Sequence, residues 1–356
     1  MSVHFATHPR SLLRHYLLAG YVLLILYASL SPFTGWQEQG LEFGAVISSP
    51  LWLTYTTFDA LTNWLAYLPL GVLFALTLRT HFESGRSLLF ATLGSVLLSI
   101  VLEYLQMYLP SRTSSNTDIL TNGLGAFSGA LLAWVIAPRV WFARATQWRI
   151  ELFQRGHGVD FGLALVMLWM FAQINPSLPI LGNVFITEAA HRIFVAMPEE
   201  PFNIWESVAV ALNLLMIGLL LQTLLQERRH AVVALMLILC VVALAKFIAA
   251  AVFLKSWALL LWLNGEAMLG IVVGLMLMWG MNWLRRPYLL WMAALVALGY
   301  FVLALWVLDS GTPSAAMRLY QWRYGHLLNY NGLSQIVSVM FPLLLGVYLG
   351  WARRRL

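Results

Sequence analysis

The chain alternates between long apolar segments and short polar loops. Ten segments are apolar over enough residues to cross about 30 Å of hydrocarbon as α-helices. They lie near residues 16–34, 58–78, 87–109, 119–137, 160–175, 203–225, 231–253, 257–283, 288–308 and 334–351. The fifth is the shortest and ends at Pro176. We therefore predict an all-α polytopic membrane bundle of about ten transmembrane helices.

Composition supports a membrane protein and excludes two other classes. Of the 356 residues, 61% are hydrophobic and 10% are charged, against about 45–50% and about 25% in soluble domains. So few charges cannot cover the surface of a soluble enzyme, and a disordered chain is less apolar still. Cys240 is the single cysteine, which excludes a disulfide framework and a zinc site made of thiolates.

The basic residues are unevenly distributed between the loops on the two sides of the predicted bundle. With the spans numbered alternately, fifteen of the 21 lysines and arginines fall on one side: Arg10, Arg14, Arg79, Arg86, Arg139, Arg144, Arg149, Arg155, Arg228, Arg229, Arg285, Arg286, Arg353, Arg354 and Arg355. Cytoplasmic loops carry such an excess, so we expect both termini in the cytoplasm. The net charge of +6 then reflects topology, and no nucleic-acid partner is expected. The first span lacks a clear signal-peptidase site and is interpreted as retained.

Self-comparison indicates a weak tandem repeat with an offset of about 142–147 residues. The matched pairs are Pro32 and Pro176, Asp59 and Glu206, Glu103 and Lys246, Arg112 and Lys255, and Asn122 and Asn264. The predicted architecture is four plus four plus two helices: a four-helix domain over 1–150, a degenerate second copy over 151–286 and a two-helix segment over 287–356. Each copy has an even number of spans, so the copies are parallel.

Polar residues of the first copy fall on single helix faces near one end of the bundle. Asp59 and Asn63 are four residues apart, Glu103 and Gln106 three apart, and Asp118 and Asn122 four apart. Alternating topology places all three pairs at the same outward-facing level. Glu103 is seven residues before Pro110, hence about 10 Å below the outer end of its helix. A carboxylate at that depth needs a partner or water.

Each of these residues also has a purely structural interpretation. Asp59 and Asp118 are suitable N-caps, and Asn63, Gln106 and Asn122 are suitable for hydrogen bonds between helices. Arg112 could pair with Glu103 in a structural salt bridge. Below Asn122, the small residues Gly125, Ala126, Gly129 and Ala133 form a stripe that permits close helix packing and turns Asp118 and Asn122 inward.

The second copy replaces the acids of the first. A Glu206–Lys246 pair joining two helices is the simplest expectation, so we interpret this half as structural or modulating. The histidines are dispersed, and no metal-ligand spacing, phosphate-binding glycine loop or nucleophile elbow is present. We expect no catalytic residue, no metal and no cofactor. The segment 185–197 is a candidate for an amphipathic surface helix.

The first copy resembles a VanZ-like domain over about residues 16–137. The resemblance is carried in order by Ser29-Leu30-Ser31-Pro32, Asp59-x-x-x-Asn63, Tyr67-Leu68-Pro69-Leu70-Gly71, Glu103-x-x-Gln106, Pro110-x-Arg112 and Asp118-x-x-x-Asn122-x-x-Gly125. It implies a four-helix domain in a bacterial cytoplasmic membrane, from a family whose named member is associated with teicoplanin resistance. It also implies that the functional residues are Asp59, Asn63, Glu103, Gln106, Arg112, Asp118 and Asn122. The second copy departs from this motif at the acids and at Pro-x-Arg.

Binding is the leading functional hypothesis. An outward-facing polar pocket could hold an envelope lipid head group, a lipid-linked saccharide or a lipoglycopeptide, with Arg112 pairing with phosphate or carboxylate. Membrane lipids are the expected partners. In the enzyme alternative, Glu103 or Asp118 is a general base acting on a lipid-linked substrate, but no nucleophile–base pair is visible. In the third alternative, the domain is a scaffold for envelope-building enzymes. Parallel repeats and an outer-level cluster do not favour transport.

Overall fold

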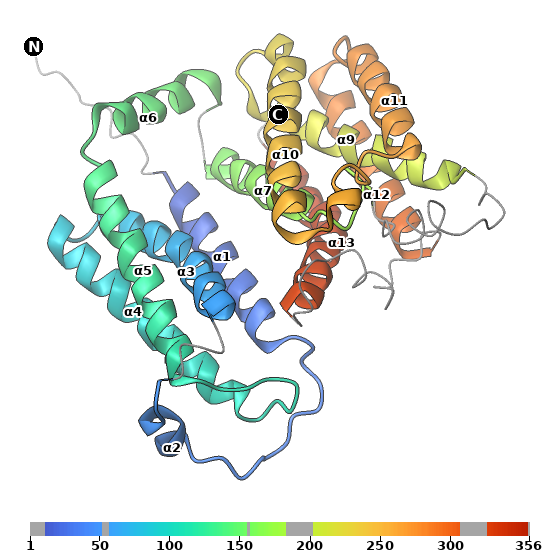
Figure 1. Cartoon of the computed structure of the whole chain (residues 1–356). Helices are drawn as coiled ribbons and strands as arrows, with labels where there is room; N and C mark the ends of the chain where they lie inside the picture. Colours follow the sequence, from blue (N-terminus) through green and yellow to red (C-terminus); the bar gives the residue numbers. More distant parts are fainter. Residues whose placement is uncertain (1–10, 52–56, 155–156, 183–201, 307–325, 355–356) are drawn as a thin grey trace, which may run out of the picture. The chain divides into compact units, whose positions relative to one another are not determined.

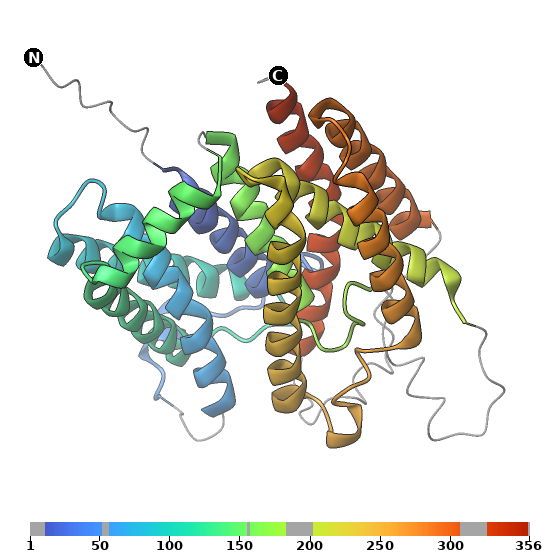
Figure 2. The ribbon, with the colours of Figure 1, turned by 90° about the horizontal axis from the view of Figure 1, so that it is seen from above.

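The computed structural model describes residues 11–51, 57–154, 157–182, 202–306 and 326–354. The chain divides into two compact units, Met1–Arg149 and Ile150–Leu356, and each is described separately below (Figures 1 and 2). Every regular element of the described ranges is a helix. The prediction of an all-α, multi-pass membrane bundle is therefore confirmed.

Unit 1 is built on four long helices at the expected positions. These are α1 (Leu13–Leu30), α3 (Thr57–Leu78), α4 (Ser84–Gln106) and α5 (Asn116–Ile136). Each is long and apolar enough to span a membrane. Helix α3 packs against the other three, most extensively against α5. Two short helices were not predicted: α2 (Phe43–Ser48) and α6 (Val140–Leu152), which runs across the boundary between the units.

Glycines make the contact between α3 and α5 unusually close. A Cβ atom on Gly129 would lie 1.9 Å from the carbonyl oxygen of Leu68, and one on Gly125 would lie 2.3 Å from that of Trp64. No other residue type fits at those positions, because any side chain would collide with the backbone of α3. The predicted stripe of small residues is thus a packing surface, with Ala126 and Ala133 also buried along it.

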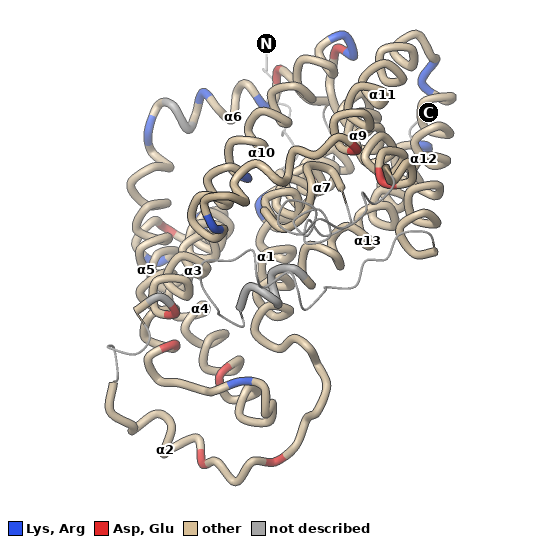
Figure 3. Tube along the Cα trace, turned by 45° about the vertical axis from the view of Figure 1, so that its right-hand side comes forward, with Lys and Arg blue, Asp and Glu red and all other residues tan. Residues whose placement is uncertain are grey.

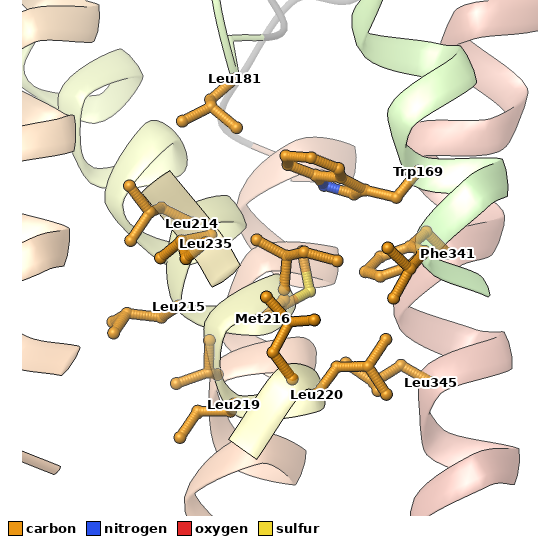
Figure 4. Packing of buried hydrophobic residues seen from close by; sticks show 14 of the residues in the cluster. Trp169, Leu181, Leu214, Leu215, Met216, Leu219, Leu220, Leu235, Phe341 and Leu345 are labelled. Carbon is orange, nitrogen blue, oxygen red and sulfur yellow. The ribbon is translucent and has the colours of Figure 1, made fainter. Parts of the chain in front are cut away.

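Unit 2 is organised around one buried helix. Helix α9 (Ile204–Leu224) packs against α7 (His157–Gln173), α10 (Ala231–Phe253), α11 (Gly265–Met281) and α12 (Arg286–Trp306), and α13 (His326–Arg353) packs against α7 and α12. Two 3₁₀ turns, Arg228–His230 and Ser256–Ala258, flank α10. Buried side chains such as Leu214, Met216 and Leu220 of α9 meet Trp169 of α7 and Phe341 of α13 in the core (Figure 4).

Eight helices of the described residues meet the length and hydropathy of a membrane span. The other two predicted spans appear as shorter apolar helices, Gly158–Gln173 and Gly265–Met281. The span predicted over 257–283 is therefore wrong at its start, because Asn264 caps a helix that begins only at Gly265. The proposed surface helix at 185–197 lies outside the described residues. Helices α12 and α13 belong to the same compact unit as α7–α11, while the division at residue 286 stays a prediction.

Candidate functional site

The polar residues of unit 1 gather where α1 and α4 end and α3 and α5 begin. Figure 3 shows how few charged residues interrupt the helices. Side-chain hydrogen bonds join these helix ends directly: Gln106 of α4 reaches the end of α1, and Glu103 of α4 reaches the start of α5. The structure therefore brings residues from separate predicted spans into one cluster.

Glu103 holds the start of α5 through its carboxylate. The side chain is only 3% exposed, and Oε2 accepts a hydrogen bond of 2.8 Å from the backbone N–H of Ser115. Ser115 is itself the N-cap of α5, since its hydroxyl oxygen accepts from Thr117 N at 3.2 Å. The first N–H groups of a helix lack partners within the helix and favour negative charge nearby. The helix start thus supplies a hydrogen-bond partner that partly offsets the cost of burying this carboxyl group.

Gln106 and Arg112 hold the end of α1. Gln106 Nε2 donates to the carbonyl of Ser29 at 3.0 Å, and Arg112 Nη2 donates to those of Ala28 and Ser31 at 2.6 and 3.0 Å. The last carbonyls of a helix need donors and attract cations. Burial lowers the pKa of the Arg112 guanidinium, and the nearby Glu103 carboxylate acts in the opposite direction. The two side chains thus fix the end of α1 to the rest of the cluster.

A second polar layer lies deeper between the helices. Asn122 of α5 donates through Nδ2 to the hydroxyl oxygen of Ser99 on α4 at 2.9 Å. Tyr67 of α3 contacts the Ser99 side chain and lies within electrostatic range of Glu103 and Asp118. Asn122 is 6% exposed, and its Oδ1 atom is enclosed without a hydrogen-bond partner among the described residues. Buried amide oxygens normally have a partner, so this atom is unusual.

The three remaining predicted residues lie nearer the helix ends and are half-buried. Asp118 is not the N-cap of α5, because Ser115 caps it and Asp118 follows in the first turn; it acts electrostatically on Glu103. Asp59 lies in the first turn of α3. Asn63, one turn later, makes no side-chain hydrogen bond within the described ranges. Both share a helix face with Tyr67, which places them on the side of α3 that leads to the cluster.

Sequence reasoning missed Tyr67, Ser99 and Ser115 as members of this cluster. Two of them were visible as periodic positions. Tyr67 continues the four-residue spacing of Asp59 and Asn63, and Ser99 lies four residues before Glu103. Ser115 had no comparable signal, because several hydroxyl residues of the loop could have capped α5 equally well.

In unit 2, different residues bond the helix ends. The predicted Glu206–Lys246 pair is wrong: the ammonium group of Lys246, on α10, donates instead to the carbonyls of Gln173 and Asn175. Lys246 is completely buried, and these carbonyls lie at the end of α7. Here Glu266 accepts from the backbone N–H of Asn203, the N-cap of α9, at 3.4 Å.

No group of three or more His, Cys, Asp or Glu side chains suited to a metal occurs in the described part of the chain.

Comparison with protein-family models identifies the first unit. Residues 11–137 match the family model VanZ/LLP1. Unit 1 carries a VanZ-like domain. The match spans α1 to α5 and includes all seven residues of the predicted site, which confirms the resemblance read from the motifs. No curated protein and no solved structure matches the chain. With its apolar helices, the chain is a multi-pass membrane protein with a VanZ-like domain.

Proposed function

We propose that the VanZ-like domain binds the polar head group of an envelope lipid, lipid-linked saccharide or lipoglycopeptide in a bacterial cytoplasmic membrane. The observation that carries the proposal is the enclosed Asn122 Oδ1 atom, which has no hydrogen-bond partner among the described residues. An unpaired buried acceptor costs about 1–3 kcal/mol, and a donor group of a ligand would remove that cost.

The local chemistry favours a ligand rich in hydroxyl or amino groups. The carboxylates of Glu103 and Asp118 add acceptor oxygens to this region, since both lie within electrostatic range of Tyr67, which contacts the Ser99 side chain that Asn122 bonds. The amide of Gln106 and Nη2 of Arg112 already donate to carbonyls of α1. Acceptors recognise sugar hydroxyls or amines better than phosphate. A saccharide head group therefore fits this cluster better than the phosphate expected from Arg112 alone.

The distribution of arginines supports an outward-facing cluster. Arg14 and Arg86 lie in the first turns of α1 and α4, and Arg79 and Arg139 follow the ends of α3 and α5. All four are therefore at the end of the helices opposite to Glu103 and Asn122. Arginine-rich ends are typical of the cytoplasmic side, which would leave the cluster in the outer leaflet, within reach of lipid-linked saccharides.

Photo-crosslinking in membranes tests the proposal. The probe is a photoactivatable polyprenyl-linked saccharide, compared with the same polyprenyl phosphate without sugar and with a teicoplanin-like lipoglycopeptide. We expect labelling by the saccharide probe to fall several-fold in Asn122→Ala and Glu103→Gln. It should not change in Ser111→Ala, an exposed position of the adjacent loop.

Two results would contradict the proposal. Unchanged labelling in Asn122→Ala and Glu103→Gln, when thermal unfolding shows both to be folded, would place the probe elsewhere. Equal labelling by the sugar-free phosphate would contradict the preference for a saccharide head group, because phosphate rather than hydroxyl groups would then be recognised.

A scaffold role is the second candidate, because three predicted site residues hold helix ends together. Glu103 holds the start of α5, and Gln106 and Arg112 hold the end of α1. This role predicts that Glu103→Leu lowers the thermal stability while labelling by every probe stays unchanged.

A further inference from the structure

The connection between α1 and α3, here residues 31–51, exposes an unusual amount of apolar surface. Five large apolar side chains are between 44% and 53% exposed: Phe33, Trp36, Leu41, Ile47 and Leu51. Over the same residues the charged side chains are Glu38 and Glu42. A loop in water buries such side chains or does without them, and clustered exposed apolar groups mark an interaction surface.

The connection is fixed to the helix ends of unit 1. The backbone N–H of Gln37 donates to the carbonyl of Tyr108 at 2.9 Å, and Gln39 Nε2 donates to that of Met107 at 2.8 Å. Asn116, the first residue of α5, donates to the carbonyls of Ile47 and Ser49 at the end of α2. The connection therefore lies beyond the ends of α4 and α5 (Figure 1), at the level where the spans leave the hydrocarbon.

Its polar groups are satisfied in a way that suits a weakly hydrated environment. The hydroxyl of Ser48 donates to the carbonyl of Gly44 at 2.9 Å, and that of Ser49 donates to Val46 at 2.8 Å. Together with the bonds from Asn116, these contacts give the two hydroxyl groups, and carbonyls of α2 and its C-cap, partners within the protein. Internal satisfaction of backbone groups is what lipid requires of a polypeptide.

The apolar surface of the connection is continuous with the lipid-facing side of α4. The ring of Phe43 packs edge-on against Tyr104 with centroids 5.5 Å apart, and Tyr104 packs against Tyr108 at 5.6 Å. Tyr104 and Val101 are themselves exposed on α4, where a membrane span meets lipid. The aromatic rings thus extend the lipid-facing surface of α4 toward α2.

We infer that residues 33–51 lie in the membrane interface, with Ile47 and Leu51 inserted among the lipids and the exposed carboxylate of Glu38 on the aqueous side. The occupant of the exposed surface is the bilayer, because the surface continues that of a membrane span and several polar groups of α2 and the preceding loop bond within the protein. Trp36, with its indole N–H bonded to the carbonyl of Phe33, has the position typical of interfacial tryptophans. This inference does not depend on the proposed ligand.

Site-directed spin labelling of the full chain tests the inference. Because Cys240 is the single cysteine, Cys240→Ser gives a background for Ile47→Cys, Leu51→Cys and the reference sites Leu23→Cys and Glu38→Cys. Leu23 is exposed on the apolar face of α1 and reports lipid, and Glu38 reports water. The labelled proteins are reconstituted in phosphatidylethanolamine–phosphatidylglycerol vesicles, and accessibility to oxygen and to a water-soluble nickel chelate is measured.

We expect labels at 47 and 51 to be several-fold less accessible to the nickel chelate than the label at 38. Their accessibility to oxygen should be high, as at 23. Nickel accessibility equal to that at 38 would place the connection in water and overturn the inference. Low accessibility to both reagents would also overturn it, because protein would then cover the surface. A label at Leu41 serves as an independent position if either variant does not fold.

Discussion

Both units stabilise the end of their first long helix with a donor from a neighbouring helix or loop, yet they use different residues. In unit 1, Gln106 and the loop residue Arg112 bond the carbonyls at the end of α1. In unit 2, the single residue Lys246 bonds those at the end of α7 from within α10. By the predicted repeat, Lys246 corresponds to Glu103, which instead bonds the start of α5.

The comparison shows that the sign of a buried charge decides which helix end it stabilises. A carboxylate needs N–H donors and favours the start of a helix, whereas an ammonium needs carbonyls and favours the end. In unit 1 the cation, Arg112, lies in a half-buried loop, so the interior between the helices contains the acceptor oxygens of Glu103 and Asn122 and, among the described residues, no cation. Placing the cation in the core of unit 2 leaves Lys246 bonded entirely to backbone. This contrast is the physical reason for proposing ligand binding in unit 1 and a structural role for unit 2.

The largest effect is expected from removing the buried cation of unit 2. Lys246→Met keeps most of the length of the side chain but leaves the carbonyls of Gln173 and Asn175 without their donor. Since each hydrogen bond to a charged group contributes about 1.5–3 kcal/mol, we expect the free energy of unfolding in detergent to fall by about 3 kcal/mol. The exposed Lys255→Met is the matched control. Equal stability of Lys246→Met and Lys255→Met would show that Lys246 does not stabilise the end of α7.

The next effect concerns close helix packing at glycine, which occurs within each of the two units. In Gly129→Ala the new methyl group would collide with the carbonyl oxygen of Leu68, and overpacking costs about 1–3 kcal/mol. Gly270→Ala in α11 should act similarly, because its methyl would lie 2.5 Å from the carbonyl oxygen of Ser207. Gly20→Ala, with nothing within 4 Å, is the control. Thermal unfolding followed by tryptophan fluorescence measures all three, and a stable Gly129→Ala would disprove the close contact.

A smaller effect is expected at Glu103, where two variants distinguish loss of the hydrogen-bond acceptor from loss of the charge. Glu103→Leu removes the acceptor of the Ser115 N–H group, and we expect a loss of about 1.5 kcal/mol for the unpaired donor. Glu103→Gln retains an acceptor oxygen and should recover most of that stability. Chemical unfolding in detergent distinguishes the two variants. If Glu103→Gln were as unstable as Glu103→Leu, the negative charge itself would stabilise the start of α5. Glu103 would then resemble Lys246, whose charged group stabilises the end of α7.

The smallest effect is expected at the end of α1. Gln106→Ala removes one neutral hydrogen bond to Ser29, worth about 1 kcal/mol, while Arg112 still bonds Ala28 and Ser31. Hydrogen exchange at the last turn of α1 should increase, with little change in global unfolding. Unchanged exchange would show that Arg112 alone fixes this helix end.

The sequence was informative wherever periodicity carried the signal. Apolar segment length located the spans, and the spacing of Glu103, Asn122 and the glycines of α5 identified the buried faces. It failed where several partners were equally possible. The spacing of Lys246 and Glu206 suggested an ion pair, and nothing in the sequence placed the carbonyls of Gln173 and Asn175 within reach. Capping by Ser115 instead of Asp118 was missed for the same reason.

The sequence by itself determined that the chain is a multi-pass membrane protein whose first part carries a VanZ-like domain. Hydrophobic length and ordered motifs are local properties of the chain, so they need no three-dimensional information. Only the tertiary structure decided what the polar residues bond. A hydrogen bond depends on a few ångströms between atoms far apart in sequence, and in a buried site the nearest backbone group takes precedence over a more distant charge.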